Sequence, residues 1–144
     1  GSELPRIFGI AELTEPRLVT WAVKGDLLVA VVERASGAGI ALGDVRGGSR
    51  IRPDGTRINW ELTDPFADRA GGTLPFFIDW GGSPHPAEAG PSGAQLLELR
   101  VEHPEAAAVG AQLAALGLPL PVAQGRRAAL FATVRTAGMT VVLA

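Results

Sequence analysis

Leu18-Val-Thr-Trp-Ala-Val23 is followed 78 residues later by Leu96-Leu-Glu-Leu-Arg-Val101, and at the same offset Gly39-Ile40 corresponds to Gly117-Leu118. Both six-residue stretches are rich in valine, leucine or tryptophan and read as strands. Self-similarity at one fixed offset without a gap indicates a duplicated structural unit.

A helix is predicted after each of these strands. In the first copy Asp26 is a good N-cap, and the apolar residues that follow recur at helical spacing until Gly37 and Gly39 end the pattern. In the second copy His103 stands at the predicted cap and Pro104 at the first helical position, before an apolar stripe that ends at Gly117. Both copies therefore begin as a strand followed by a helix.

Hairpins are predicted beyond the helices. Pro53-Asp54-Gly55 is a turn sequence between Arg50-Ile-Arg52 and the strand at residues 57–62, and residues 74–80 form one further strand. In the second copy, strands at residues 129–134 and 140–143 flank a turn near Ala137-Gly138. We predict four segments, which are 1–15 (tag remnant Gly1-Ser2 and a linker-like stretch), 16–80 (a βαβββ-like unit), 81–94 (a loop) and 95–144 (a shorter βαββ-like unit).

The predicted fold class is α+β. Tandem βαβββ-type units place helices on the outer face of a curved mixed sheet and leave the inner face uncovered. Two such sheets side by side would form a cup, a shape suited to holding a ligand.

Composition narrows the function classes. The chain has 144 residues, 13 basic against 15 acidic side chains, one lysine (Lys24) and no cysteine. A net charge of −2 offers no basic face, so we expect no nucleic-acid partner. No apolar run approaches the length that spans a bilayer, so we expect no membrane partner and a soluble, cytoplasmic protein. Thiolate chemistry is excluded, and two histidines are too few for a three-imidazole site.

Two segments carry a resemblance to a known family. Ser49–Leu62 contains the Arg-Pro-Asp-Gly hairpin, and Pro75–Pro86 reads Pro-Phe-Phe-Ile-Asp-Trp-Gly-Gly-Ser-Pro-His-Pro. From about Phe8 onward the chain resembles the glyoxalase-like proteins of the vicinal oxygen chelate superfamily. In that family a stretch similar to Ile7–Leu13 lies in mid-chain, so the resemblance implies that an N-terminal unit is missing here.

The resemblance also permits a test for a metal site. Metal enzymes of the superfamily take ligands from the first and last strands of paired units. The first-strand positions correspond to Leu18 and Leu96, which bind no metal. The last strands offer Asp79, or alternatively Glu61, and no acid in residues 140–143. We therefore expect no complete metal site and no cofactor in this chain, although a divalent metal remains compatible with a longer protein.

Six residues are candidates for ligand binding, namely Arg50, Arg52, Trp60, Asp79, Trp80 and His85. The tryptophans would form an apolar pocket wall, or simply core. Asp79 would act as a ligand or base, or instead cap the nearby loop. His85 is either held rigidly over a pocket mouth or hydrogen-bonded to loop backbone. The arginines would bind a carboxylate or phosphate, or remain solvated.

Three functions stay open at this point. The first is a small-molecule-binding cup without a complete metal site and with no catalytic residue assigned. The second is a fragment of a metal-dependent lyase, isomerase or dioxygenase whose ligands lie partly in the missing unit. The third is a non-catalytic dimerisation module, because unpaired sheet edges can pair with another chain to give a homodimer.

Overall fold

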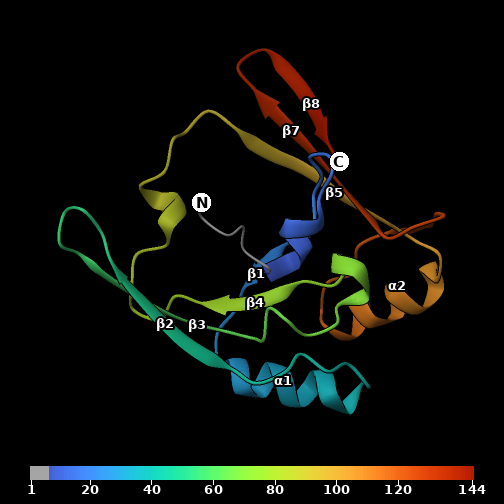
Figure 1. The fold of residues 1–144 in the computed structure, drawn as a ribbon, viewed down its shortest axis with the longest axis horizontal. Coiled ribbons are helices and arrows are strands. Elements are labelled where there is room, and N and C mark those ends of the chain that lie inside the picture. The colour runs from blue at the N-terminus through green and yellow to red at the C-terminus, as the bar shows by residue number, and fades with distance from the viewer. Residues whose placement is uncertain (1–6) are drawn as a thin grey trace. The chain divides into compact units, whose positions relative to one another are not determined.

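The computed structural model describes residues 7–144, so the predicted tag remnant Gly1-Ser2 lies outside the described residues. Within them the chain forms two α-helices and two mixed four-stranded sheets (Figure 1). The α+β class with tandem strand-helix-strand units is confirmed. None of these helices is long and apolar enough to cross a membrane.

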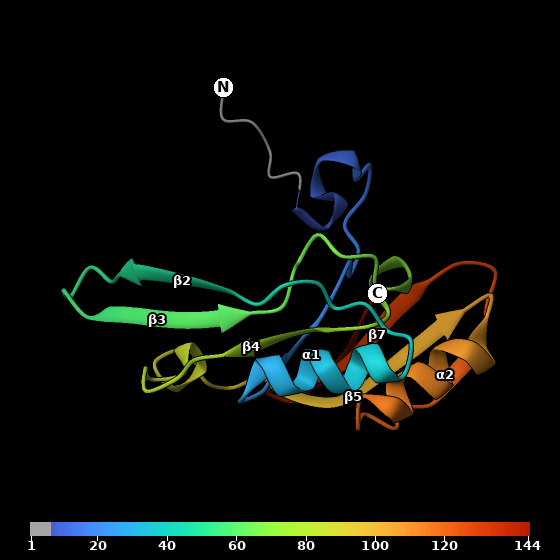
Figure 2. The same ribbon diagram turned by 90° about the horizontal axis from the view of Figure 1, so that it is seen from below.

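The first sheet has the strand order β1-β4-β3-β2. Its elements are β1 (Ala22–Lys24), α1 (Leu28–Gly37), β2 (Arg46–Ile51), β3 (Arg57–Leu62) and β4 (Phe76–Asp79). β1 runs parallel to β4, and the other neighbours are antiparallel. In Figure 2, β2 and β3 form a long hairpin and α1 lies along β4. The predicted strand at residues 18–23 is largely wrong, because pairing with β4 begins only at Ala22.

The second sheet has the strand order β6-β5-β7-β8. Its elements are β5 (Gln95–His103), α2 (Ala106–Ala115), β6 (Val122–Gln124), β7 (Ala129–Thr136) and β8 (Met139–Leu143). β6 pairs parallel with β5, so this unit has one more strand than the sequence pattern predicts. The two sheets are therefore alike in their strand-helix beginnings and different in strand order.

The helices confirm the repeat. α2 begins and ends 78 residues after α1, which is the offset found in the sequence. Gly39 and Gly117, which follow the two helices, both have φ of 78°, a left-handed conformation that glycine adopts without strain. The residue after each glycine donates its N–H to the carbonyl five residues earlier, at 2.8 Å after α1 and 2.9 Å after α2. Both helices thus end in the same glycine cap.

The predicted helix starts are wrong by one or two residues. The N-cap of α1 is Leu27, with φ of 47° and no side-chain hydrogen bond, rather than Asp26. The N-cap of α2 is Glu105 rather than His103. His103 ends β5, and its Nδ1 accepts the N–H of Glu105 at 2.9 Å, so the imidazole stabilises the bend that leads into α2.

Apolar stripes of the helices cover one face of each sheet. α1 buries Leu28, Val31 and Ala35, and α1 contacts β4. α2 buries Val109 and Leu113 and contacts β5 and β6. Complete burial of one such aliphatic side chain contributes about 1.5–3 kcal/mol, so these stripes hold each helix on its sheet.

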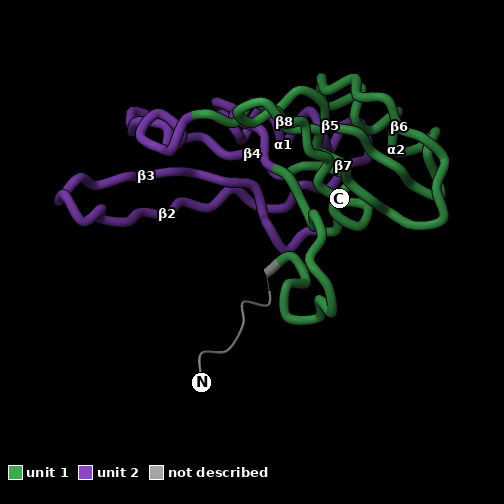
Figure 3. Tube along the Cα trace, turned by 90° about the horizontal axis from the view of Figure 1, so that it is seen from above, with its two compact units in different colours: residues 1–21, 68–75, 93–144 green, residues 22–67, 76–92 purple. Residues whose placement is uncertain are grey.

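The chain divides into two compact units, shown in Figure 3. The first-sheet unit consists of residues 22–67 and 76–92. The second-sheet unit consists of residues up to Trp21, residues 68–75 and residues 93–144. These compact units follow spatial proximity, whereas the predicted segments 16–80 and 95–144 follow the order of elements along the chain.

Candidate functional site

The β2–β3 hairpin turns where the sequence predicts. Gly55 has φ of 85°, and its N–H donates to the carbonyl of Arg52 at 2.9 Å. Asp54 Oδ1 accepts the backbone N–H of Thr56 at 2.9 Å. This hydrogen bond stabilises the charged carboxylate and holds the pKa of Asp54 below its usual value of 3.8. The turn fixes the register of every residue pair in the hairpin.

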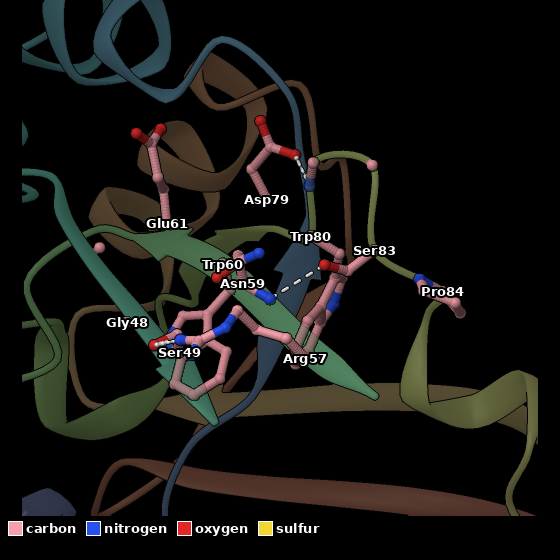
Figure 4. A pocket seen from close by; sticks show the side chains of 13 residues that line it. Gly48, Ser49, Arg57, Asn59, Trp60, Glu61, Asp79, Trp80, Ser83 and Pro84 are labelled. Carbon is pink, nitrogen blue, oxygen red and sulfur yellow. Dashed lines mark hydrogen bonds between the residues drawn. The ribbon is translucent and has the colours of Figure 1, made fainter. Parts of the chain in front are cut away.

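Two acidic side chains face each other where β3 meets β4. Glu61 lies directly opposite Asp79, and β3 and β4 share only this pair and the next one. Figure 4 shows both carboxylates pointing in the same direction. Asp79 Oδ1 accepts the N–H of Gly81 at 2.7 Å, so this side chain also caps the loop that follows β4.

Two indole rings lie beside these carboxylates in the sequence and point the other way, as alternation along a strand requires (Figure 4). The ring centroids of Trp60 and Trp80 are 6.0 Å apart, with an interplanar angle of 60°. Trp60 lies opposite Gly48, where a side-chain Cβ would come within 2.6 Å of the indole ring. Glycine at position 48 therefore leaves the space that the Trp60 ring occupies.

An open cavity of about 870 Å³ lies at this end of the first sheet (Figure 4). The lining residues come from β2, from β3, and from the end of β4 with the loop beyond it. They are Gly47, Gly48, Ser49, Arg57, Asn59, Trp60, Glu61, Asp79, Trp80, Gly81, Gly82, Ser83 and Pro84. Ser83 Oγ accepts the backbone N–H of Asn59 at 2.9 Å, which ties the loop to β3. The loop that lines one part of the cavity is thus held against β3.

The structure brings together half of the predicted site residues. Trp60, Asp79 and Trp80 all line the cavity. Arg50 and Arg52 do not line it; Arg50 is exposed on β2, and Arg52 is part of the turn.

His85 is also not among the lining residues, although its ring contacts Trp80 at a centroid distance of 5.6 Å. Its Nδ1 accepts the N–H of Ala87 at 3.0 Å, so the imidazole is hydrogen-bonded to the loop backbone, one of the two arrangements expected for this residue. His85 and His103 each precede a proline, and each accepts the amide two residues later. Both imidazoles therefore have a local backbone role.

Sequence reasoning missed Arg57 and Asn59 as members of the site. Arg57 Nη1 donates to Ser49 Oγ at 3.4 Å across the hairpin, and both residues line the cavity. A signal was present, because Arg57, Asn59 and Glu61 alternate along β3 and so share one face of the strand. Their relation to Asp79 depends on the β3–β4 register, which no local pattern encodes.

Within residues 7–144, no three His, Asp or Glu side chains gather closely enough to hold a metal ion. Glu61 and Asp79 supply two carboxylates, a kind of donor that divalent ions take in proteins. The other positions suggested by the resemblance, Leu18 and Leu96, carry no donor atom.

A family model described as a glyoxalase-like domain matches residues 1–117. The chain belongs to the glyoxalase-like domain family. The match includes the whole first sheet of this glyoxalase-like domain, together with β5 and α2, and it ends before β6. It confirms the resemblance drawn from residues 49–62 and 75–86. No curated protein and no solved structure matches this glyoxalase-like chain.

Proposed function

We propose that this glyoxalase-like domain binds a small organic molecule in the cavity at the end of β3 and β4. The observation that carries the proposal is the lining itself, which includes two packed indole rings and, pointing the other way from the same strands, a facing pair of carboxylates with an arginine on the face of Glu61. Ligand sites in proteins combine aromatic walls with a few polar groups in cavities of about 300–1,000 Å³. The volume of about 870 Å³ falls within that range.

The polar groups indicate what the ligand presents. The carboxylates of Glu61 and Asp79 accept hydrogen bonds, so they suit hydroxyl or amino groups. Arg57 donates, so it suits a carbonyl or carboxylate. The rings of Trp60 and Trp80, which point away from the carboxylates, suit an apolar or planar portion of a ligand. We therefore propose a metabolite that carries both polar and apolar groups.

We further propose that binding needs no resident metal ion, since the described part of the chain contributes just two acidic groups to the lining, Glu61 and Asp79. Divalent metal salts alone should then leave the melting temperature unchanged. A stoichiometric ion that binds with better than micromolar affinity would favour the metal-enzyme alternative instead.

Thermal unfolding in the presence of a small-metabolite library tests the proposal. A ligand at a hundred times its Kd adds about 2.7 kcal/mol to the stability of the folded state. For a chain of this size, that corresponds to a rise in melting temperature of about 5–10 °C. Calorimetric titration then gives the Kd of each compound that raises the melting temperature.

Two matched variants locate the binding site. Glu61→Gln removes a charge from the cavity without changing its shape, and Glu33→Gln makes the same change on the exposed surface of α1. Because hydrogen bonds to a charged group are worth about 1.5–3 kcal/mol, we expect Glu61→Gln to weaken binding roughly tenfold or more. Glu33→Gln should bind like the wild type. Equal affinities for the two variants, or a library without a single binder, would contradict the proposal.

A further inference from the structure

Among residues 7–144 the two sheets have four edge strands, and these strands differ in how well they are protected against pairing with another chain. β1 and β6 are only three residues long, and β1 carries Lys24. β2 is six residues long and carries Arg46 and Arg50. Short strands and charged side chains are the usual features that prevent edge-to-edge association.

β8 has neither form of protection. Its five residues, Met-Thr-Val-Val-Leu, contain no charge and no proline. Met139 is 61% exposed, Val142 59% and Leu143 47%. Within the described residues, β8 pairs on one side only, with β7. The strand therefore presents an unpaired main chain flanked by apolar side chains.

The free main-chain groups belong to alternate residues. Thr136 pairs with Met139 across the two-residue turn, and antiparallel pairs alternate between hydrogen-bonded and non-hydrogen-bonded. The N–H and C=O groups of Met139, Val141 and Leu143 therefore face β7. The N–H and C=O groups of Thr140 and Val142 point away from β7. These two donors and two acceptors are available for hydrogen bonds to another strand.

We infer that β8 pairs antiparallel with β8 of a second copy of this chain, about a twofold axis at Val141. In that register Thr140 lies opposite Val142 of the second copy, and the outward groups of both strands form four hydrogen bonds. Met139 lies opposite Leu143 of the second copy, so two of the three exposed apolar side chains of β8 cover those of the other copy. Identical strands suit this arrangement because a twofold interface must be complementary to itself.

Charge distinguishes β8 from β2, the other edge strand that is longer than three residues. Homotypic pairing of β8 brings no charged side chain opposite another, so no repulsion opposes it. Paired with itself, β2 would bring the arginines at positions 46 and 50 of both copies onto one ladder. The β8 pairing joins the two second sheets into one continuous eight-stranded sheet.

Two double variants that differ at one position test the register. Arg135 lies opposite Thr140 within the hairpin, so a glutamate at position 140 gains an opposite charge there and the hairpin is retained. T140E/V142E places glutamates opposite each other twice across the twofold axis. T140E/V142K places glutamate opposite lysine twice. Ile51→Lys serves as a control, because Ile51 is 62% exposed at the end of the edge strand β2.

Sedimentation velocity over a range of concentrations measures the association. We expect the wild type and Ile51→Lys to dimerise, T140E/V142E to associate roughly tenfold more weakly or worse, and T140E/V142K to dimerise again. Far-UV circular dichroism checks that each variant is folded. A wild type that is monomeric at every concentration would overturn the inference. So would equal behaviour of the two double variants, whether both associate or neither does.

Discussion

Replacing Gly48 by alanine tests whether the cavity wall depends on glycine beneath the Trp60 ring. A Cβ at position 48 would lie 2.6 Å from Cε2 of Trp60 and 2.7 Å from both Cζ2 and Nε1. Ordinary carbon contacts begin at about 3.5 Å, so the indole must move by about 1 Å. The ring is rigid and adjoins Trp80, so we expect the strain of overpacking, which typically costs about 1–3 kcal/mol.

Gly47→Ala is the matched control. It lies one residue away on the same strand, and the nearest atom to its Cβ would be the carbonyl oxygen of Trp60 at 3.7 Å, an ordinary contact. Because alanine also loses less conformational entropy on folding than glycine, Gly47→Ala should be neutral or slightly stabilising.

Urea unfolding and near-UV circular dichroism measure the two effects. Gly48→Ala should lower the free energy of unfolding by about 1–3 kcal/mol and weaken the dichroism that arises from coupling between Trp60 and Trp80. If Gly48→Ala were as stable as Gly47→Ala and kept the wild-type spectrum, the described packing of Trp60 would be refuted.

Three further predictions concern single interactions. Thr63 is fully buried, and its Oγ1 accepts the N–H of Phe77 at 3.0 Å. Thr63→Val should therefore lower the free energy of unfolding in urea by about 1–3 kcal/mol, and Thr63→Ser should lower it less. Equal losses for the two variants would argue against this hydrogen bond. The pKa of Asp54 is lowered, so its charged carboxylate stabilises the folded state. This stabilisation is complete above about pH 4 and is lost as the pH falls through the lowered pKa. The difference in melting temperature between the wild type and Asp54→Asn should therefore decrease from about pH 5 to about pH 2, and a difference independent of pH would show that the Thr56 contact is absent. Leu113→Ala removes a fully buried side chain of α2 and should cost about 2–5 kcal/mol; a loss below about 1 kcal/mol would place Leu113 outside the core.

Features governed by neighbouring residues were predictable from the sequence. The turn at Pro53-Asp54-Gly55 and the glycine caps at Gly39 and Gly117 follow from backbone preferences of a few adjacent residues. The apolar stripes of α1 and α2 follow from helical periodicity. These signals were sufficient for the α+β class and for the repeat.

Features that depend on distant pairing were not predictable. β6 is three residues long and follows Pro121, so its sequence reads as a loop, and only parallel pairing with β5 makes it a strand. The helix start at Leu27 requires a positive φ that leucine rarely adopts, whereas a local preference favours Asp26.

The candidate site was predictable in part for the same reason. Asp79 and Trp80 were found because they stand in an unusual local motif at the end of a strand. Arg57 lines the cavity and Arg50 does not. This difference depends on the hairpin register and on the course of the loop after β4. Counting back from the turn at residues 53–55 would have placed Gly48 opposite Trp60, so this contact was within reach of the sequence.

The most direct test of the proposed binding site is an NMR titration of the three indole N–H groups with a compound that raises the melting temperature. Trp60 and Trp80 line the cavity. Trp21 belongs to the second-sheet unit, where its Nε1 donates to the carbonyl of Thr73 at 2.8 Å, so it serves as an internal reference. The account predicts that the Trp60 and Trp80 resonances shift with saturation while that of Trp21 stays in place. A ligand that binds and shifts only Trp21, or none of the three, would contradict it.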